Sequence, residues 1–193
     1  MIAYMVRHGE AENNVSGVFP DDEKVSYHLT QVGRDQARAV SSWLGRAKPL
    51  LIVSSPVTRA RETAEIISAE LGIPLKLDER LREAKLGSLV GMDYNEFSRQ
   101  DPNWYEDYFS EGSKYGIEKF HSIRSRMISA ITEQWGSGPV VFVSHLEPIR
   151  SVVSIALGMS GPSVRKIRIF NGSITTVSVN APEIDVVSLN CLP

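Results

Sequence analysis

Cysteine is nearly absent from this chain of 193 residues, in which Cys191 is the only one. A single thiol excludes an internal disulfide framework and a zinc site built from several cysteines, and it suits a reducing compartment. The sequence also lacks an apolar run of about 20 residues, the length that a membrane-spanning helix needs. Its apolar beginning reaches Arg7 too soon to form the core of a secretory signal. These absences predict a cytoplasmic protein with no membrane partner.

Excess charge of either sign is also missing. The 21 lysines and arginines nearly balance the 23 aspartates and glutamates, so the formal net charge is −2. A chain without a strong basic excess has no overall attraction for nucleic acid or for an anionic membrane, and we expect neither as a partner. Any anion must therefore bind at a local cluster of cations.

Linkers, internal repeats and low-complexity tracts are absent as well. The length and the 42% hydrophobic content are those of one globular domain with a substantial core. We therefore expect residues 1–193 to form a single domain. A homodimer is left open as the assembly.

Two apolar runs end in the same way, with a histidine within two residues of the end of the run. They are residues 1–6, followed by Arg7 and His8, and residues 140–144, followed by His145. Short apolar runs predict buried strands, and ligands bind at the carboxyl ends of strands in an open α/β sheet. The pattern therefore predicts one anion-binding pocket at this edge of the sheet.

Strands and helices alternate along most of the chain. Thr30 is expected to cap a helix whose apolar residues recur at helical spacing. The further predicted strands are residues 50–53, 75–77, 166–170, 173–179 and 186–189, with Asn171-Gly172 as a hairpin turn. The polar stretch of residues 10–27 is expected to be a loop. This alternation predicts an α/β sheet covered by helices on both faces.

The helix after the strand at residues 50–53 carries a cation at its start. Ser55 is expected to cap this helix and Pro56 to take its first position, which places Arg59 in the first turn. Helix N-termini bind anions and disfavour cations, so an arginine there indicates an anion beside it. Arginine also donates two parallel hydrogen bonds to a phosphate. We therefore assign Arg59 to the same pocket.

Four motifs follow one another along the chain. They are Arg7-His8-Gly9-Glu10 with Asn14, Ser54-Ser55-Pro56 with Arg59-Ala60, Leu81-Arg82-Glu83, and Ser144-His145. In this order they resemble the histidine phosphatase superfamily, the phosphoglycerate mutase-like proteins. The resemblance implies an α/β fold of three layers, α/β/α, with a mostly parallel central sheet. It also implies a small cap insertion at about residues 88–121.

The resemblance further implies a role for each motif. The catalytic residues would be His8 as the nucleophile that becomes phosphohistidine, Glu83 as the general acid, and His145. The phosphate ligands would be Arg7, Arg59, Asn14 and the backbone of Leu146. No metal and no other cofactor is implied. The predicted function is metal-independent hydrolysis of a small phosphorylated metabolite, a phosphomonoester.

The predicted cap is irregular, aromatic and acidic. Residues 88–116 hold six acidic and two basic side chains, which leaves four net negative charges. Such a stretch inside a compact domain is usually a lid or a binding loop, and we assign substrate contacts to Tyr105 and Tyr108. The negative charge predicts a preference for aryl phosphates or singly phosphorylated metabolites over polyanions.

Departures from the family pattern leave alternatives open. Leu146 follows His145 where the family usually has glycine, and Leu86 stands where cofactor-dependent mutases place a tyrosine. A phosphoglycerate mutase, which returns the phosphoryl group to a substrate hydroxyl, is the closest alternative. A non-catalytic phosphate-binding protein is another. A metal hydrolase built on the local histidines and glutamates is disfavoured, because their spacing matches no helical metal motif.

Overall fold

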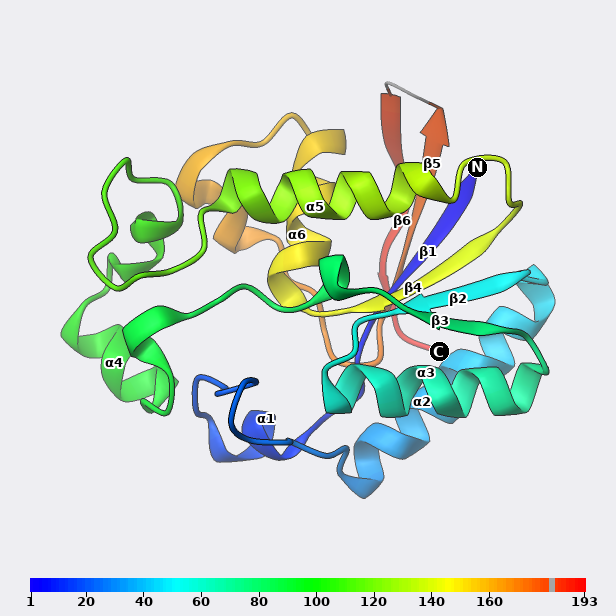
Figure 1. The fold of residues 1–193 in the computed structure, drawn as a ribbon, viewed down its shortest axis with the longest axis horizontal. Helices are drawn as coiled ribbons and strands as arrows, with labels where there is room; N and C mark the ends of the chain where they lie inside the picture. Colours follow the sequence, from blue (N-terminus) through cyan, green and yellow to red (C-terminus); the bar gives the residue numbers. More distant parts are fainter. Residues whose placement is uncertain (181–182) are drawn as a thin grey trace.

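The centre of the molecule is a six-stranded sheet (Figure 1). The computed structural model describes residues 1–180 and 183–193. The strands are β1 (Ile2–Arg7), β2 (Leu51–Ser54), β3 (Leu75–Leu77), β4 (Val140–Ser144), β5 (Ile174–Asn180) and β6 (Glu183–Cys191). Their order across the sheet is β3-β2-β4-β1-β5-β6; the first four are mutually parallel, and β5 and β6 are antiparallel to their neighbours. The predicted α/β class with a mostly parallel sheet is confirmed.

Helices cover both faces of this sheet (Figure 1). The pair α2 (Gln31–Ala47) and α3 (Thr58–Leu71) covers one face, and the pair α5 (Phe120–Glu133) and α6 (Leu146–Ala156) covers the other. Successive strand residues point to opposite faces, so Val6 packs with the first pair and Met5 with the second. The three-layer arrangement is therefore confirmed. Among the described residues, no helix combines the length and the apolar character needed to cross a membrane.

The register of β1 and β4 brings the two histidine motifs together. Arg7 pairs with Ser144 in these parallel strands, so the next residues, His8 and His145, leave the sheet side by side. The backbone N–H of His8 donates to the carbonyl of Ser144 at 3.0 Å, and the two imidazole rings lie 5.1 Å apart between centroids. The two histidines thus lie at one edge of the sheet, as the two apolar runs predict.

Helix α3 begins later than the sequence indicates. Thr58 is its first residue, and Val57 stands at the N-cap with no side-chain hydrogen bond, so the predicted start at Pro56 is wrong. The Ser55 hydroxyl accepts instead from the Val57 N–H at 3.3 Å and contacts His145 at 2.9 Å. Arg59 still lies in the first turn. The cap of α2 is as predicted, since the Thr30 hydroxyl accepts from the N–H of Gly33.

The strand predicted at residues 166–170 does not form. A 3₁₀ helix, η4 (Gly161–Lys166), precedes a segment without strand pairing, and β5 pairs with β1 instead. Arginine side chains take the carbonyls that a neighbouring strand would have used: Arg150 donates to Ile167 at 2.7 Å, and Arg7 donates to Ile169 at 2.6 Å. The hairpin at Asn171-Gly172 is therefore wrong as well. The predicted edge strand lies within β6.

Short helices form much of the chain between the longer elements. They are α1 (Glu12–Ser16), inside the stretch predicted as a loop, and then η1 (Glu79–Leu81), η2 (Gly87–Leu89), α4 (Tyr94–Gln100) and η3 (Trp104–Tyr108). The chain after α1 pairs with the predicted cap through a bridge between Val18 and Asp93. The N-terminal loop and the cap segment therefore form one structure over the strand ends.

Candidate active site

His8 is held as a neutral imidazole whose lone pair lies at Nε2. Its Nδ1 lies 2.7 Å from the carbonyl of Gly9 and must donate to it, while its Nε2 accepts from Nε of Arg59 at 3.1 Å. Burial, followed by the charges of Arg59 and Arg7, holds the pKa of His8 well below its ordinary value. A neutral ring with a fixed lone pair at Nε2 is the form that attacks phosphorus.

Arg59 joins both histidines to an acidic residue that the sequence did not single out. Its Nη2 donates to Nδ1 of His145 at 3.2 Å, and its guanidinium donates to the Asp22 carboxylate at 2.5 and 3.0 Å. The Arg59 side chain is 1% exposed and that of Asp22 is 16% exposed. Asp22 lies in the polar loop after α1. Only the folded chain brings it to the arginine.

His145 is buried behind this arginine. Because Arg59 can only donate, Nδ1 of His145 accepts, and the ring hydrogen sits on Nε2, which donates to the Ser55 hydroxyl at 2.9 Å. Burial and then the charge of Arg59 hold the pKa of His145 well below its ordinary value. The ring is fully buried and is not among the residues that line the adjoining cavity.

Glu83 lies at the N-terminus of α6. Its carboxylate accepts from three backbone N–H groups: those of Ala84 at 2.9 Å and of Leu146 and Glu147 at 3.2 Å each. Burial and the neighbouring charge of Glu147 raise the pKa of Glu83 to about 7, against the opposing effect of Arg59 and Arg7. Near neutral pH this carboxyl group is therefore able both to give and to take a proton.

The Leu146 amide has a hydrogen-bond partner within the chain. The sequence assigned this backbone group to phosphate, whereas in the structure it donates to Glu83. Asn14 lines the cavity beside His8, and its Oδ1 accepts from the backbone of Ala11 and from Asn171. Asn171 also donates to the His8 carbonyl at 3.1 Å. It holds the backbone of His8, a contact that the sequence motif did not reveal.

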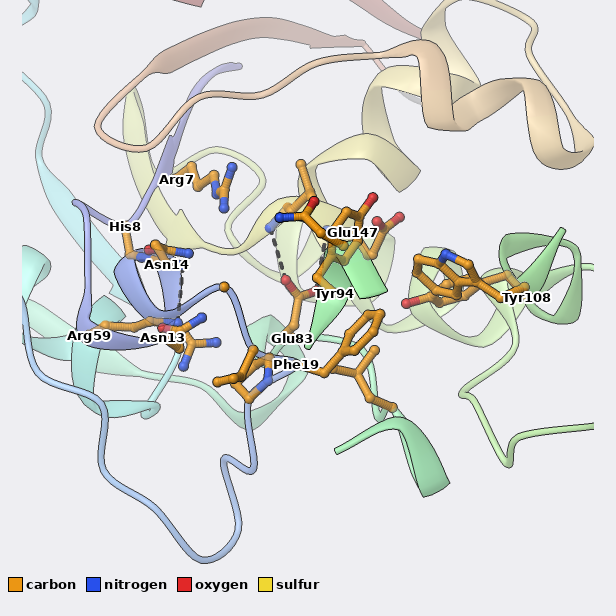
Figure 2. Close-up of a pocket in the computed structure, with 17 residues that line it drawn as sticks. Arg7, His8, Asn13, Asn14, Phe19, Arg59, Glu83, Tyr94, Tyr108 and Glu147 are labelled. Atoms are coloured by element: carbon orange, nitrogen blue, oxygen red, sulfur yellow. Dashed lines mark hydrogen bonds between the residues drawn. The ribbon is translucent and has the colours of Figure 1, made fainter. Parts of the chain in front are cut away.

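A cavity of about 340 Å³ connects these groups. In Figure 2, Arg7, His8, Asn14 and Arg59 lie on one side of it, Glu83, Glu147 and Phe19 lie near its middle, and Tyr108 lies toward the other side. One end is therefore cationic and the other is aromatic. Asn13 also lines the cavity, and its buried Oδ1 has no hydrogen-bond donor among the described residues. That oxygen is suited to accept from a substrate hydroxyl or amine.

The two tyrosines assigned to substrate have different positions. Tyr108 lines the cavity, whereas Tyr105 does not. The Tyr105 hydroxyl donates to Glu147 at 2.6 Å, and Glu147 also accepts from Arg150 at 2.6 Å. A direct contact between Tyr105 and substrate is therefore not supported. Its hydrogen bond positions Glu147 at the cavity wall.

The acidic residues of the cap do not face the cavity. The acidic side chains that line it are Glu83 and Glu147, both from outside the predicted cap, and the cap contributes Tyr94, Asn95, Trp104 and Tyr108. Asp107, one of the six acidic residues counted in the cap, accepts from the backbone of Lys114 and Tyr115. The electrostatic reason for a preference against polyanions is therefore wrong.

Arg126 of α5 fixes the segment that carries Glu83. Its guanidinium donates to the carbonyls of Arg80 and Arg82 at 2.6 Å each and to that of Glu83 at 3.3 Å, and it forms an ion pair with Glu118. An arginine that binds three backbone carbonyls of one short segment has no local sequence signature. Among residues 1–180 and 183–193, no group of three or more histidine, cysteine, aspartate or glutamate side chains has the arrangement of a metal site.

Comparison with known proteins gives a match over nearly the whole chain. The model of the histidine phosphatase superfamily, branch 1, matches residues 3–192. The chain is 32% identical over 180 residues to a 2,3-bisphosphoglycerate-dependent phosphoglycerate mutase of Thermoplasma acidophilum, covering 92% of this chain and 87% of the mutase. It is 31% identical over 169 residues to a glucosyl-3-phosphoglycerate phosphatase of Mycolicibacterium vanbaalenii, covering 80% of this chain and 73% of the phosphatase.

Solved structures give the same result. A mycobacterial glucosyl-3-phosphoglycerate phosphatase solved with VO3 superposes with a TM-score of 0.85 at 27% identity, over 98% of this chain and 99% of the other. A structure described as mycobacterial hydrolase 1 superposes with a TM-score of 0.87 at 27% identity, over 100% and 99% of the two chains. The similarity extends over both the sheet and the segments that line the cavity.

Proposed function

Because the chain belongs to branch 1 of the histidine phosphatase superfamily, we propose that it is a metal-independent phosphatase that hydrolyses a small phosphomonoester through a phosphohistidine at His8. The observation that carries this proposal is the pairing of a neutral His8 ring with a carboxyl group of pKa about 7 on one cavity. The first group supplies a nucleophile and the second supplies a proton. Both lie beside fixed cations.

The first step transfers the phosphoryl group to the protein. Nε2 of His8 forms a bond to phosphorus while the bond from phosphorus to the leaving oxygen breaks, and protonated Glu83 gives that oxygen its proton. Arg7 and Arg59 meet the charge that spreads over the phosphoryl oxygens, which is the main contribution of a protein to such a transfer. The Nδ1–H bond to the Gly9 carbonyl keeps the ring in the required tautomer.

The second step releases phosphate. Glu83, now a carboxylate, takes a proton from water as the water oxygen attacks phosphorus, and the bond from phosphorus to Nε2 breaks. Glu83 is then protonated again and His8 is neutral, so the cycle is balanced. His145 holds Arg59 from behind, through the hydrogen bond that its Nδ1 accepts from that guanidinium.

Acid-quenched labelling tests the proposal. A labelled phosphomonoester should give an acid-labile, base-stable phosphoenzyme, and turnover should persist in EDTA. His8→Ala should abolish both the label and the turnover, whereas His121→Ala, at an exposed histidine of α5, should leave them unchanged. Full turnover in the His8→Ala protein, or loss of activity in EDTA that a divalent metal restores, would overturn the proposal.

A phosphoglycerate mutase is the second candidate, favoured by the relative from Thermoplasma acidophilum that covers most of the chain. Phosphorus NMR separates the two reactions. With 3-phosphoglycerate and its bisphosphate activator, a phosphatase releases inorganic phosphate with little 2-phosphoglycerate. Rapid interconversion of the two phosphoglycerates without net phosphate release would establish the mutase instead.

A further inference from the structure

A second cavity of about 440 Å³ adjoins the proposed catalytic cavity. The two share Arg7, Tyr94 and Leu146 as lining residues. The second one is also lined by Arg150, Arg165 and Arg168, and no acidic residue lines it. Four arginines therefore surround one cavity in a chain whose formal net charge is −2.

Three of these arginines have no acidic partner. Arg150 is paired with Glu147, but Arg7, Arg165 and Arg168 form no salt bridge with any described carboxylate. The Nε of Arg7 is buried without an acceptor among the described residues. Arg168 is exposed, and its side chain forms no hydrogen bond within the part of the chain that the structure describes. Within residues 1–180 and 183–193, Arg7 and Arg168 thus keep side-chain donors that have no acceptor.

Arg165 is held in position by neutral groups. Its guanidinium donates to the Tyr94 hydroxyl at 3.1 Å and to the carbonyl of Pro102 at 3.4 Å, and it lies 5.4 Å from the ring of Trp104. These contacts orient the Arg165 guanidinium without neutralising its positive charge. Like charges gathered on one wall repel one another, and an anion between them would remove that cost.

The same wall is built by the segment that fails to form a strand. Arg7 donates to the carbonyl of Ile169, and Arg150 donates to those of Ile167 and Arg165. These bonds tie the segment that carries Arg165 and Arg168 to the end of β1 and to α6. The backbone that carries Arg165 and Arg168 is therefore fixed relative to His8, which directly follows Arg7.

We infer that the substrate carries a second anionic group on the part that leaves, and that this group binds at Arg165 and Arg168 while the phosphoryl group lies at His8. The inference rests on the proposed function for the place of the phosphoryl group. It names the substrate class as phosphomonoesters of acids. The planar fork of arginine suits both a carboxylate and a second phosphate, so the shared chemistry is an oxyanion.

Binding of non-hydrolysable phosphonates tests this inference without requiring turnover. Calorimetry compares butylphosphonate with 4-phosphonobutyrate, which adds a carboxylate, and with 1,4-butanediyl bisphosphonate, which adds a second phosphonate. The wild-type protein should bind at least one of the two ligands that carry a second anionic group about tenfold more tightly than butylphosphonate. About tenfold is the factor expected of one charge-assisted hydrogen bond. The tighter of the two identifies the oxyanion.

In Arg168→Gln, the ratio of the affinity for that ligand to the affinity for butylphosphonate should fall to nearly one. The affinity for butylphosphonate itself should not change. Lys166→Gln is the matched control, because it removes one positive charge from the same segment at an exposed residue that lines neither cavity. Thermal melting checks that both variants are folded.

Equal affinity of the wild-type protein for all three phosphonates, or no measurable binding of any of them, would overturn the inference. So would an equal loss of affinity in the two variants. Hydrolysis of phenyl phosphate with His8-dependent labelling is measured separately and decides the proposed function alone.

Discussion

The guanidinium of Arg59 holds the carboxylate of Asp22 through Nη1 and Nη2 while its Nε donates to the nucleophile candidate, His8. The two donors that Asp22 occupies are the parallel pair that would bind a phosphate. Asp22 is therefore an internal competitor for the anion. It lies on a loop, so an incoming phosphate can displace it without disturbing the sheet.

Asp22→Asn should strengthen the inhibition of the protein by inorganic phosphate by several-fold to about tenfold, because the competing charge is removed. The inhibition constant for phosphate is the measurement. Asp21→Asn changes the net charge equally at the neighbouring residue, which contacts Lys24 rather than Arg59, and should leave the constant unaltered. Weaker phosphate inhibition in Asp22→Asn would show that Asp22 assists anion binding.

Glu83 should impose a pH dependence on substrates with poor leaving groups. Its pKa is raised to about 7, so the protonated form that gives a proton to the leaving oxygen is present below this pH and is lost as the pH rises through it. The value of kcat for an alkyl phosphate should therefore fall above about pH 7. For p-nitrophenyl phosphate, whose leaving group is weakly basic, the fall should be smaller.

Glu83→Gln should lower kcat for the alkyl phosphate by about 10²–10⁴-fold and flatten this limb of the pH profile. Glu79→Gln, at an exposed glutamate just before the same motif, is the control and should retain the wild-type profile. If the alkaline limb survives in Glu83→Gln, another group supplies the proton.

Tyr105→Phe should destabilise the fold without removing a substrate contact. The change leaves one oxygen of the buried Glu147 without its donor, at a cost of about 1–3 kcal/mol. For a chain of this length the melting temperature should drop by roughly 2–4 °C per kcal/mol. Tyr27→Phe removes a hydroxyl that forms no hydrogen bond within the described residues and should not shift the melting temperature. An undiminished melting temperature together with a raised KM would restore Tyr105 as a substrate contact.

Two glycines of α2 should respond to alanine in opposite directions. A Cβ at Gly33 would lie 2.0 Å from the carbonyl oxygen of Glu10, so Gly33→Ala must displace the backbone at the end of the first motif and should cost about 1–3 kcal/mol or more. A Cβ at Gly45 meets only Leu71 at 3.5 Å, an ordinary contact. Gly45→Ala should stabilise the helix by about 0.5–1 kcal/mol. Denaturant unfolding of both variants measures the difference, and a loss of stability in each would contradict it.

The sequence by itself determined the strand ends, the helix pattern and the family. Arg7, His8 and His145 could be placed because they directly follow apolar runs, and parallel strands bring their carboxyl ends to one edge whatever the rest of the chain does. Arg59 could be placed because the first turn of a helix is a local feature. These predictions depend on residues that are neighbours in the chain.

Only the tertiary structure decided which groups meet across long separations in sequence. Asp22 reaches Arg59, and the Leu146 amide turns to Glu83 instead of to phosphate, through contacts that no local pattern encodes. The alternation at residues 166–170 has the form of a strand, but side chains of Arg7 and Arg150 satisfy its carbonyls, so the segment stays irregular and carries its arginines to the cavity. The electrostatic basis for a preference against polyanions, predicted from the net charge of the cap, was wrong for the same reason. The electrostatic field at a site depends on which side chains face it, and packing decides which ones do.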